Sequence, residues 1–187
     1  MEKQVSPRIS FTKTNDFLEV RITQKIASWK EILLGLWLLL WAGCGLVFVI
    51  EAMKIEGAQR WLFVVIIAFW AFFFFRIGKV FMWRRIGVEV LRFAEGKLSI
   101  TNRFGSVGKP QFFSLDNVNA LNEIKLDNTS FFQFMDNSFW IIGGDRLGFS
   151  HMSKQYQFGK QISEMEVRAL KPMLNKALRE YKVRDRD

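Results

Sequence analysis

Two long apolar runs separated by a short polar break dominate the hydropathy pattern of the chain. The first covers residues 32–53 and the second residues 61–83, and both consist mainly of Leu, Ile, Val, Phe and Trp with few charges. About 20 residues of α-helix cross a hydrocarbon core of about 30 Å, and each run reaches this length. The pattern therefore predicts a transmembrane helical hairpin at residues 29–84, with residues 54–60 as a short loop outside the cytoplasm.

The distribution of positive charge predicts how this hairpin is oriented. The net charge is +9, and Lys and Arg gather before the first run and after the second, whereas the loop holds only Lys54 and Arg60. The cytoplasmic flanks of membrane helices carry the excess of Lys and Arg. We therefore expect a multi-pass membrane protein with both termini in the cytoplasm. The predicted membrane-anchoring residues are Trp29, Lys30, Arg76, Lys79, Trp83, Arg84 and Arg85.

Aromatic and small residues inside the two runs indicate where helices pack. Two Trp residues four positions apart share one face of the first helix, and small residues nearby let another helix approach closely. That helix is either the second helix of the same hairpin or a helix of another membrane protein, and the sequence leaves both open. The predicted helix-packing residues are Trp37, Trp41, Gly43, Gly45 and Trp70.

Apolar and polar residues alternate before the first helix. Residues 1–7 are polar, and we expect no regular structure there. Residues 8–26 alternate on both sides of Asn15 and Asp16, which suit a turn, and this predicts a β-hairpin within a cytoplasmic segment at residues 1–28. Because an isolated hairpin is marginally stable, we expect it to pack on the domain that follows the second helix.

After the second helix the apolar period changes from helical to two, which predicts a cytoplasmic domain at residues 85–181. Turn residues divide this stretch into about seven short strands, typical of a small antiparallel β-sandwich or barrel. The strand-forming runs are residues 87–93, 97–102, 111–115, 118–126, 131–135, 139–142, 146–151 and 155–158.

An amphipathic helix is predicted to cap this domain at its C-terminal end. Ser163 and Glu166 have the spacing of a capping box, and apolar residues recur at helical spacing to about Tyr181. Pro172 lies inside the pattern and predicts a kink or a frayed turn. The last residues, 182–187, are charged and predicted to be a disordered tail.

Short strands closed by one C-terminal amphipathic helix are the order of a pleckstrin-homology (PH) fold. With Trp29 leading into the first helix, the strand pair VEVLRFAEGKLSITNRFG and the closing run YQFGKQISEMEVRALKPMLNKAL, this order resembles the bacterial membrane-anchored PH-like proteins, which place two transmembrane helices before the strands. The layout is also similar to the chloroplast photosystem I assembly factor family in size and order. Both resemblances imply a membrane-tethered interaction or assembly module without catalytic residues.

Few residues of the chain offer chemistry. His151 is the single histidine and Cys44 the single cysteine, so a metal cluster or a disulfide within one chain is not expected. We find no nucleophile elbow, phosphate-binding glycine loop or nucleic-acid recognition motif, and the middle of each apolar run lacks the charge expected of a transporter. The sequence predicts no catalytic residue, metal or cofactor, and no nucleic-acid partner.

Two sets of residues offer surfaces for partners. Three basic residues flank the first hairpin after the membrane and its glycine-containing loop, and they either bind anionic headgroups or belong to a solvated loop. Five aromatic residues occur within ten positions, and because neighbours on a strand face opposite sides, about half must face away from the core or cover the helix. They are either core and helix-packing residues or, where exposed, anchors of a protein interface. These sets are Lys97, Arg103 and Lys109, and Phe131, Phe132, Phe134, Phe139 and Trp140.

These patterns together predict a membrane helical hairpin joined to an α+β domain. The function expected from them is that of a non-enzymatic inner-membrane accessory or assembly protein, whose cytoplasmic PH-like domain docks on a membrane protein complex. The alternative is a module that binds anionic lipid or senses a signal at the bilayer by itself.

Overall fold

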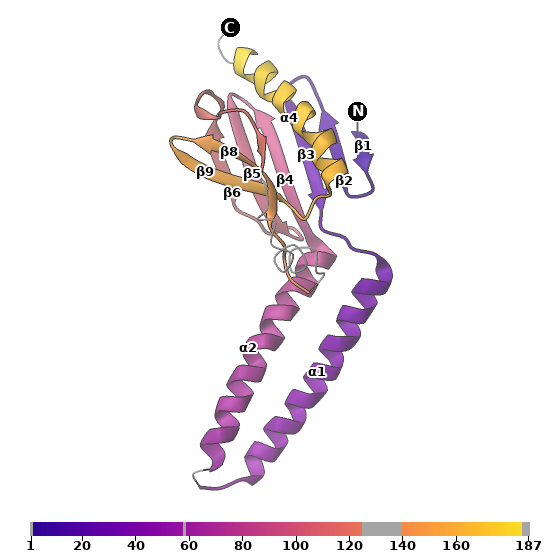
Figure 1. Cartoon of the computed structure of the whole chain (residues 1–187), viewed down its shortest axis with the longest axis vertical. Coiled ribbons are helices and arrows are strands. Elements are labelled where there is room, and N and C mark those ends of the chain that lie inside the picture. The colour runs from indigo at the N-terminus through magenta and orange to yellow at the C-terminus, as the bar shows by residue number, and fades with distance from the viewer. Residues whose placement is uncertain (1, 58, 125–139, 185–187) are drawn as a thin grey trace.

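The chain folds into a domain of β-strands with a helical arm that extends from one end (Figure 1). A computed structural model describes residues 2–57, 59–124 and 140–184. These residues contain three α-helices and nine strands, arranged as two antiparallel sheets that do not close into a barrel. The predicted strand at residues 131–135 and most of the predicted aromatic interface lie outside the described residues.

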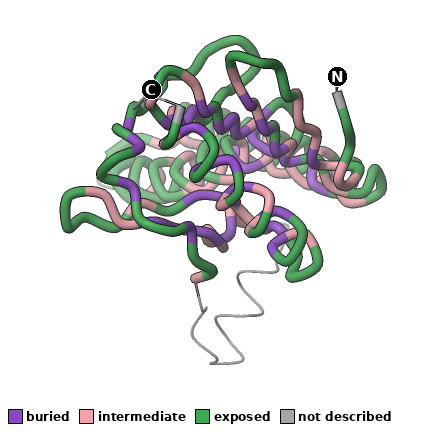
Figure 2. The backbone as a smooth tube through the Cα atoms, turned by 90° about the horizontal axis from the view of Figure 1, so that it is seen from above, coloured by how far each residue is buried: buried purple, intermediate pink, exposed green. Residues whose placement is uncertain are grey.

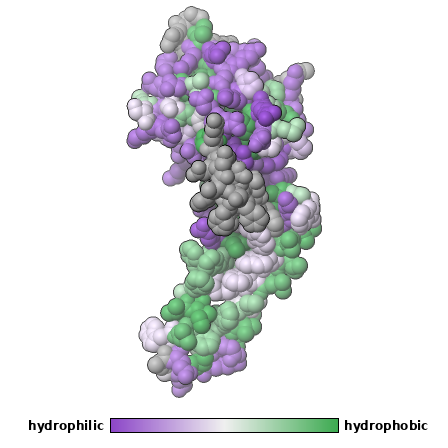
Figure 3. Space-filling model, in the orientation of Figure 1, coloured by the Kyte–Doolittle hydropathy of each residue, from purple (hydrophilic) through white to green (hydrophobic). Residues whose placement is uncertain are grey.

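The arm consists of α1 (Ser28–Lys54) and α2 (Gln59–Ile86). Both are long and apolar enough to cross a membrane, and most of their large apolar side chains are exposed, as the hydrophobic surface of the arm in Figure 3 shows. Each helix is longer than its apolar run, and the additional residues at its ends are mostly polar.

A six-stranded sheet forms the larger layer of the domain. Its strands follow one another in space as they do in the chain. They are β1 (Glu2–Ser6), β2 (Ile9–Lys13), β3 (Phe17–Thr23), β4 (Gly87–Ala94), β5 (Lys97–Phe104) and β6 (Pro110–Ser114). β3 pairs with β4 from Phe17↔Ala94 to Thr23↔Val88, so strands before and after the helical arm belong to one sheet. The expectation of irregular structure at residues 1–7 was wrong, because β1 pairs with β2 through its backbone.

A smaller sheet faces the first. It consists of β7 (Asn122–Glu123), β8 (Asp145–His151) and β9 (Lys154–Lys160), and the 3₁₀ turn η1 (Leu115–Asn117) leads toward it from β6. The strand predicted at residues 118–126 is shorter than expected in its described part, since only β7 and a single bridge between Val118 and His151 pair. Residues 140–142, predicted as part of a strand, have no strand structure.

The helix α4 (Glu164–Arg184) packs over the core between the sheets. The apolar face of α4 is buried through Val167, Leu170, Leu174 and Leu178. Figure 2 shows the buried residues, in purple, in the interior of the domain. The capping box is confirmed: the Ser163 backbone N–H donates to Glu166 Oε2 at 2.8 Å, and the Glu166 N–H donates to Ser163 Oγ at 3.2 Å.

Two expectations about the C-terminal helix are corrected. The helix continues through Pro172 without a break, and because Pro172 and Arg168 are exposed, the carbonyl that loses its N–H partner faces solvent. Residues 182–184 of the predicted tail are the last residues of α4. Lys182 holds this end by donating to the carbonyl of Val118 at 2.8 Å.

Candidate functional site

The junction between the helical arm and the sheet domain is the most polar buried region of the described structure. α2 ends at Ile86 and β4 begins at Gly87, so no linker separates helix from strand. A Cβ at Gly87 would overlap the carbonyl oxygen of Trp83, and only glycine permits this close turn. The link from β3 to α1 is held at the same place, where the Gln24 N–H donates to the Gly87 carbonyl at 3.2 Å.

Arg84 anchors this junction from the last turn of α2. It is 3% exposed, and its Nη2 donates to the carbonyl of Ile141 at 2.8 Å and to Oε1 of Gln161. Trp83, 2% exposed, packs against Phe104 of β5 with ring centroids 4.8 Å apart. The prediction that Trp83 and Arg84 anchor the chain in the lipid surface is therefore corrected, because the sheet domain folds back over the end of α2 and covers both side chains.

A second guanidinium, that of Arg8 on the β1–β2 connection, reaches the same place. Arg8 Nη1 donates to the Gln161 carbonyl at 3.2 Å and Nε donates to the Thr23 carbonyl at 3.1 Å. Gln161 therefore accepts from both arginines, and it does so with φ of 50°, a strained value for a residue with a side chain. Burial lowers the pKa of Arg8, and the nearby Glu166 carboxylate opposes this effect.

Glu166 joins α4 to the first strand at this junction. Its Oε1 accepts from the Ser6 hydroxyl at 2.7 Å, while Oε2 accepts from Ser163. Burial alone would raise the pKa of Glu166, but the hydrogen bonds from Ser163 and Ser6 and the charge of Arg8 outweigh it and lower the pKa below its usual range. The junction thus connects strands before the arm to the last helix of the chain.

Glu89 is a buried carboxyl group on β4, 1% exposed. Its Oε2 accepts from the N–H of Gly159 at 2.8 Å and of Lys160 at 3.4 Å. Burial raises its pKa to about 7, and the neighbouring Asp145 adds to the rise, whereas the hydrogen bonds and the charge of Lys160 oppose it. Lys160 also lies over the Trp83 ring, 5.5 Å from its centroid, so the carboxyl group is coupled to the junction.

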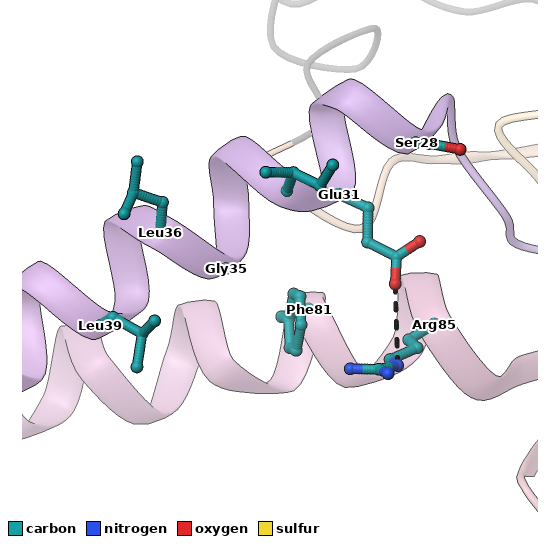
Figure 4. A pocket seen from close by; sticks show the side chains of 8 residues that line it. Ser28, Glu31, Gly35, Leu36, Leu39, Phe81 and Arg85 are labelled. Carbon is teal, nitrogen blue, oxygen red and sulfur yellow. Dashed lines mark ion pairs between the residues drawn. The ribbon is translucent and has the colours of Figure 1, made fainter.

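A groove of about 530 Å³ runs between α1 and α2 at the end nearest the sheet domain (Figure 4). Its wall is apolar, and an ion pair between Glu31 and Arg85 lies at its domain-side end. The lining residues are Ser28, Glu31, Ile32, Gly35, Leu36, Leu39, Phe81 and Arg85.

Farther along the arm, two Trp residues join the helices reciprocally. The indole N–H of Trp70 donates to the Trp41 carbonyl at 3.0 Å, and that of Trp41 donates to the Trp70 carbonyl at 3.4 Å. Gly45 lies against the Trp70 ring, where a Cβ would overlap it. Trp41, Gly45 and Trp70 lie at the contact between α1 and α2, whereas Gly43 takes no part in that contact, since a Cβ there would meet nothing within 4 Å.

Trp37 and Trp140 connect the arm to the domain. Trp37 stacks on Trp41, and its other edge contacts Trp140, with ring centroids 5.4 Å apart. Trp140 is thus a contact to α1, in line with the alternative that the predicted aromatic set covers a helix. The other members of that set, Phe131, Phe132, Phe134 and Phe139, lie outside the described residues.

The remaining predicted anchoring residues are all at least partly accessible. Trp29 is 62% exposed and Lys30 lies over its ring at 5.5 Å from the centroid, while Arg76, Lys79 and Arg85 are exposed on α2. These positions are compatible with contact to a lipid surface.

The three basic residues predicted to bind headgroups do not form one cluster. Lys97 begins β5 at the end of the sheet far from the arm, and Arg103 is near the other end of the same strand. At about 3.3 Å per residue the two lie about 20 Å apart. Lys109 lies near Arg103, across the turn that includes the 74% exposed Val107. The triad is therefore corrected to a pair, Arg103 and Lys109, beside the helical arm.

Two cavities adjoin the open side of the domain, where the edges of β6 and β9 approach without pairing. One, of about 250 Å³, is lined from both sheets by residues that include Asn102, Lys109, Gln111 and Gln157. The other, of about 280 Å³, crosses the smaller sheet and shares Tyr156 and Gln157 with the first. We call this region the seam; its lining is largely polar, and its Lys109 end is nearest the arm.

Side chains that could ligate a metal are scattered through the described ranges. No three His, Cys, Asp or Glu residues among them are placed to hold a metal ion. His151 packs edge-on against Phe113, with ring centroids 5.4 Å apart, and is a packing residue of the smaller sheet.

No protein-family model matches the chain, and no curated protein matches it either.

Sequence reasoning did not find the buried polar residues of the junction. Glu89 offered a signal, because it shares the strand face of Leu91 and Phe93, and a charge on the core-facing side of a strand is expected to be buried and paired. Arg8 and Gln161 gave no such signal, since both lie in polar connections.

Proposed function

We propose that this protein is a non-enzymatic membrane accessory protein whose sheet domain docks on an integral membrane protein. The observation that carries the proposal is the junction without a linker, in which Arg84, Trp83 and Gly87 fix the domain directly on the end of α2. Flexible linkers suit domains that search for partners, whereas this attachment gives the domain one height and one orientation relative to the helices.

We propose that the domain is PH-like, with β3 taken as the first strand. β3 to β6 then form a four-stranded layer, β7 to β9 a three-stranded layer, and α4 follows. On this view β1 and β2 are additions, and the helical arm is inserted between the first and second strands. The assignment supports an interaction module in the cytoplasm of a bacterium, with both ends of the arm on that side of the inner membrane.

The seam is the surface we propose for docking. It is polar, and among the described strands β6 and β9 each pair with a neighbour on one side only; such edges accept an additional strand from a partner. Its Lys109 end lies beside the helical arm, so a cytoplasmic segment of a neighbouring membrane protein can reach it without leaving the membrane surface.

Site-specific photocross-linking of the full chain at native expression level tests this proposal. A photoreactive residue in place of Gln157, in the seam, should cross-link to an integral membrane protein that also co-purifies in mild detergent. The matched control replaces Lys97, which is also exposed but lies at the far end of the sheet. A strictly monomeric particle in mild detergent, or equal cross-linking from both positions, contradicts docking at the seam.

A second function, binding of anionic lipid, is favoured by one observation. Arg103 and Lys109 flank a turn whose Val107 is 74% exposed, next to the arm. Basic residues around an exposed apolar tip suit the surface of an anionic bilayer.

A dye on Val107→Cys, in a Cys44→Ser background, tests this in nanodiscs. Its emission should shift to the blue when phosphatidylglycerol is added to phosphatidylcholine. The shift should vanish with Arg103→Gln and Lys109→Gln but persist with Lys97→Gln. An emission wavelength that is the same with and without phosphatidylglycerol excludes this function.

A further inference from the structure

The groove between α1 and α2 combines an apolar wall with one charge of each sign at a single end. Ile32, Leu36 and Leu39 of α1 are 70%, 53% and 72% exposed, so the wall offers apolar area that the described residues leave uncovered. Gly35 adds no side chain, and the groove continues to Phe81 of α2 (Figure 4). An apolar chain lying along this wall would be shielded on one side by both helices.

The charged end of the groove is loosely paired. Arg85 Nε and Glu31 Oε1 are 3.7 Å apart, longer than the 2.7–2.9 Å of a charge-assisted hydrogen bond, and the two side chains are 63% and 35% exposed. Such an exposed pair contributes about 0–1 kcal/mol. Within the described part of the chain neither side chain makes a hydrogen bond, so both retain hydrogen-bonding capacity for a ligand.

The charges lie where the headgroup of a membrane lipid would lie. Glu31 is in the first turn of α1 and Arg85 in the last turn of α2, both at the domain end of the arm. If the arm spans a bilayer, this end is at the interface, and the Leu-lined wall extends from it toward the hydrocarbon.

We propose that this groove binds one molecule of a zwitterionic phospholipid with a primary ammonium group, phosphatidylethanolamine. Arg85 binds the phosphate, Glu31 accepts hydrogen bonds from the ammonium group, and one acyl chain lies along Leu36 and Leu39. The glycerol hydroxyls of phosphatidylglycerol can also donate to Glu31, but they carry no positive charge, so this headgroup lacks the charge–charge attraction that an ammonium group adds. A choline headgroup carries three methyl groups in place of its N–H donors, so it cannot donate to the carboxylate.

Native mass spectrometry of the full chain in mild detergent tests the assignment. Phosphatidylethanolamine, phosphatidylcholine and phosphatidylglycerol with identical acyl chains are titrated separately. The expected result is one retained phosphatidylethanolamine, bound about tenfold more tightly than the other two lipids, as the loss of one charge-assisted hydrogen bond implies. Glu31→Gln should abolish the preference, and Arg85→Gln should weaken phosphatidylethanolamine binding by about tenfold.

The opposite end of the arm offers matched controls. Glu51 on α1 and Arg60 on α2 are exposed residues of the same types, and Glu51→Gln and Arg60→Gln should leave the preference intact. Equal retention of the three lipids would overturn the proposal and indicate an annular lipid or a partner helix in the groove. Equal effects of the variants at the two ends would overturn it as well. Neither outcome bears on the seam, so docking there can stand or fail independently.

Discussion

The reciprocal Trp41–Trp70 contact makes Gly45 the position of the arm most sensitive to a single added methyl group. In Gly45→Ala the new Cβ would lie well under 3.0 Å from the Trp70 ring. Carbon atoms pack at about 3.5–4.0 Å, so the ring or its helix must shift by about 1 Å or more. Gly43→Ala adds the same methyl group to the same helix, where nothing lies within 4 Å.

The expected cost follows from two contributions. Overpacking costs about 1–3 kcal/mol. A displaced Trp70 ring also loses the 3.0 Å hydrogen bond from its N–H to the Trp41 carbonyl, and such bonds between membrane helices contribute about 0.6–1.7 kcal/mol. Both alanine variants gain the same helix propensity, so their difference isolates packing. We expect Gly45→Ala to be less stable than Gly43→Ala by about 2–4 kcal/mol.

The measurement is the free energy of unfolding of the full chain in mixed detergent micelles of increasing dodecyl sulfate content, followed by circular dichroism. In a Trp70→Ala background the added methyl group has room, and the difference between the two alanine variants should largely disappear. If Gly45→Ala and Gly43→Ala are equally stable with Trp70 in place, the close approach of the two helices at this point is refuted.

Two further predictions concern the junction. Burial raises the pKa of Glu89 to about 7 from 4.5, so between these pH values the folded protein holds a proton that the unfolded chain has released. The free energy of unfolding should therefore fall by about 3 kcal/mol as pH rises through this range. Glu89→Gln should abolish this pH dependence, whereas the exposed Glu123→Gln should keep it. A Glu89→Gln protein with the same pH dependence as the unsubstituted protein would contradict the prediction. Arg84→Ala removes the hydrogen bonds to the Ile141 carbonyl and to Oε1 of Gln161 and leaves a cavity at a position that is 3% exposed. It should cost about 2–4 kcal/mol in the same unfolding assay, whereas the exposed Arg76→Ala should cost under about 0.5 kcal/mol. Equal losses in the two arginine variants would rule out the buried role of Arg84.

Local patterns were sufficient for most of the elements. The apolar runs predicted both long helices, and alternation together with turn residues predicted the hairpins β2–β3, β4–β5 and β8–β9, because these signals depend only on neighbouring residues. β1 was missed since its residues are polar, and its strand structure comes from pairing with β2 rather than from an apolar face.

The candidate site was harder to predict because it depends on contacts between distant segments. Trp83 and Arg84 have the composition of an interfacial anchor, and only the return of the sheet domain over the end of α2 buries them. Lys97 and Arg103 are close in sequence but lie near opposite ends of β5, a strand eight residues long. Arg8, Glu89 and Gln161 come together from three separate parts of the chain, and no local pattern records that arrangement.

The pairing of β3 with β4 has a consequence for biosynthesis. On the proposal that the arm spans a membrane, β3 leaves the ribosome before either long helix and β4 leaves after both, so the edge of β3 that pairs with β4 stays unpaired while the arm inserts. If one helix fails to insert, the two strands emerge on opposite sides of the bilayer and the six-stranded sheet cannot form. Unpaired strand edges are what aggregation and proteolytic quality control act on. On that proposal, correct folding of the domain reports on the topology of the helices, and a chain with a misplaced helix exposes its own incomplete sheet.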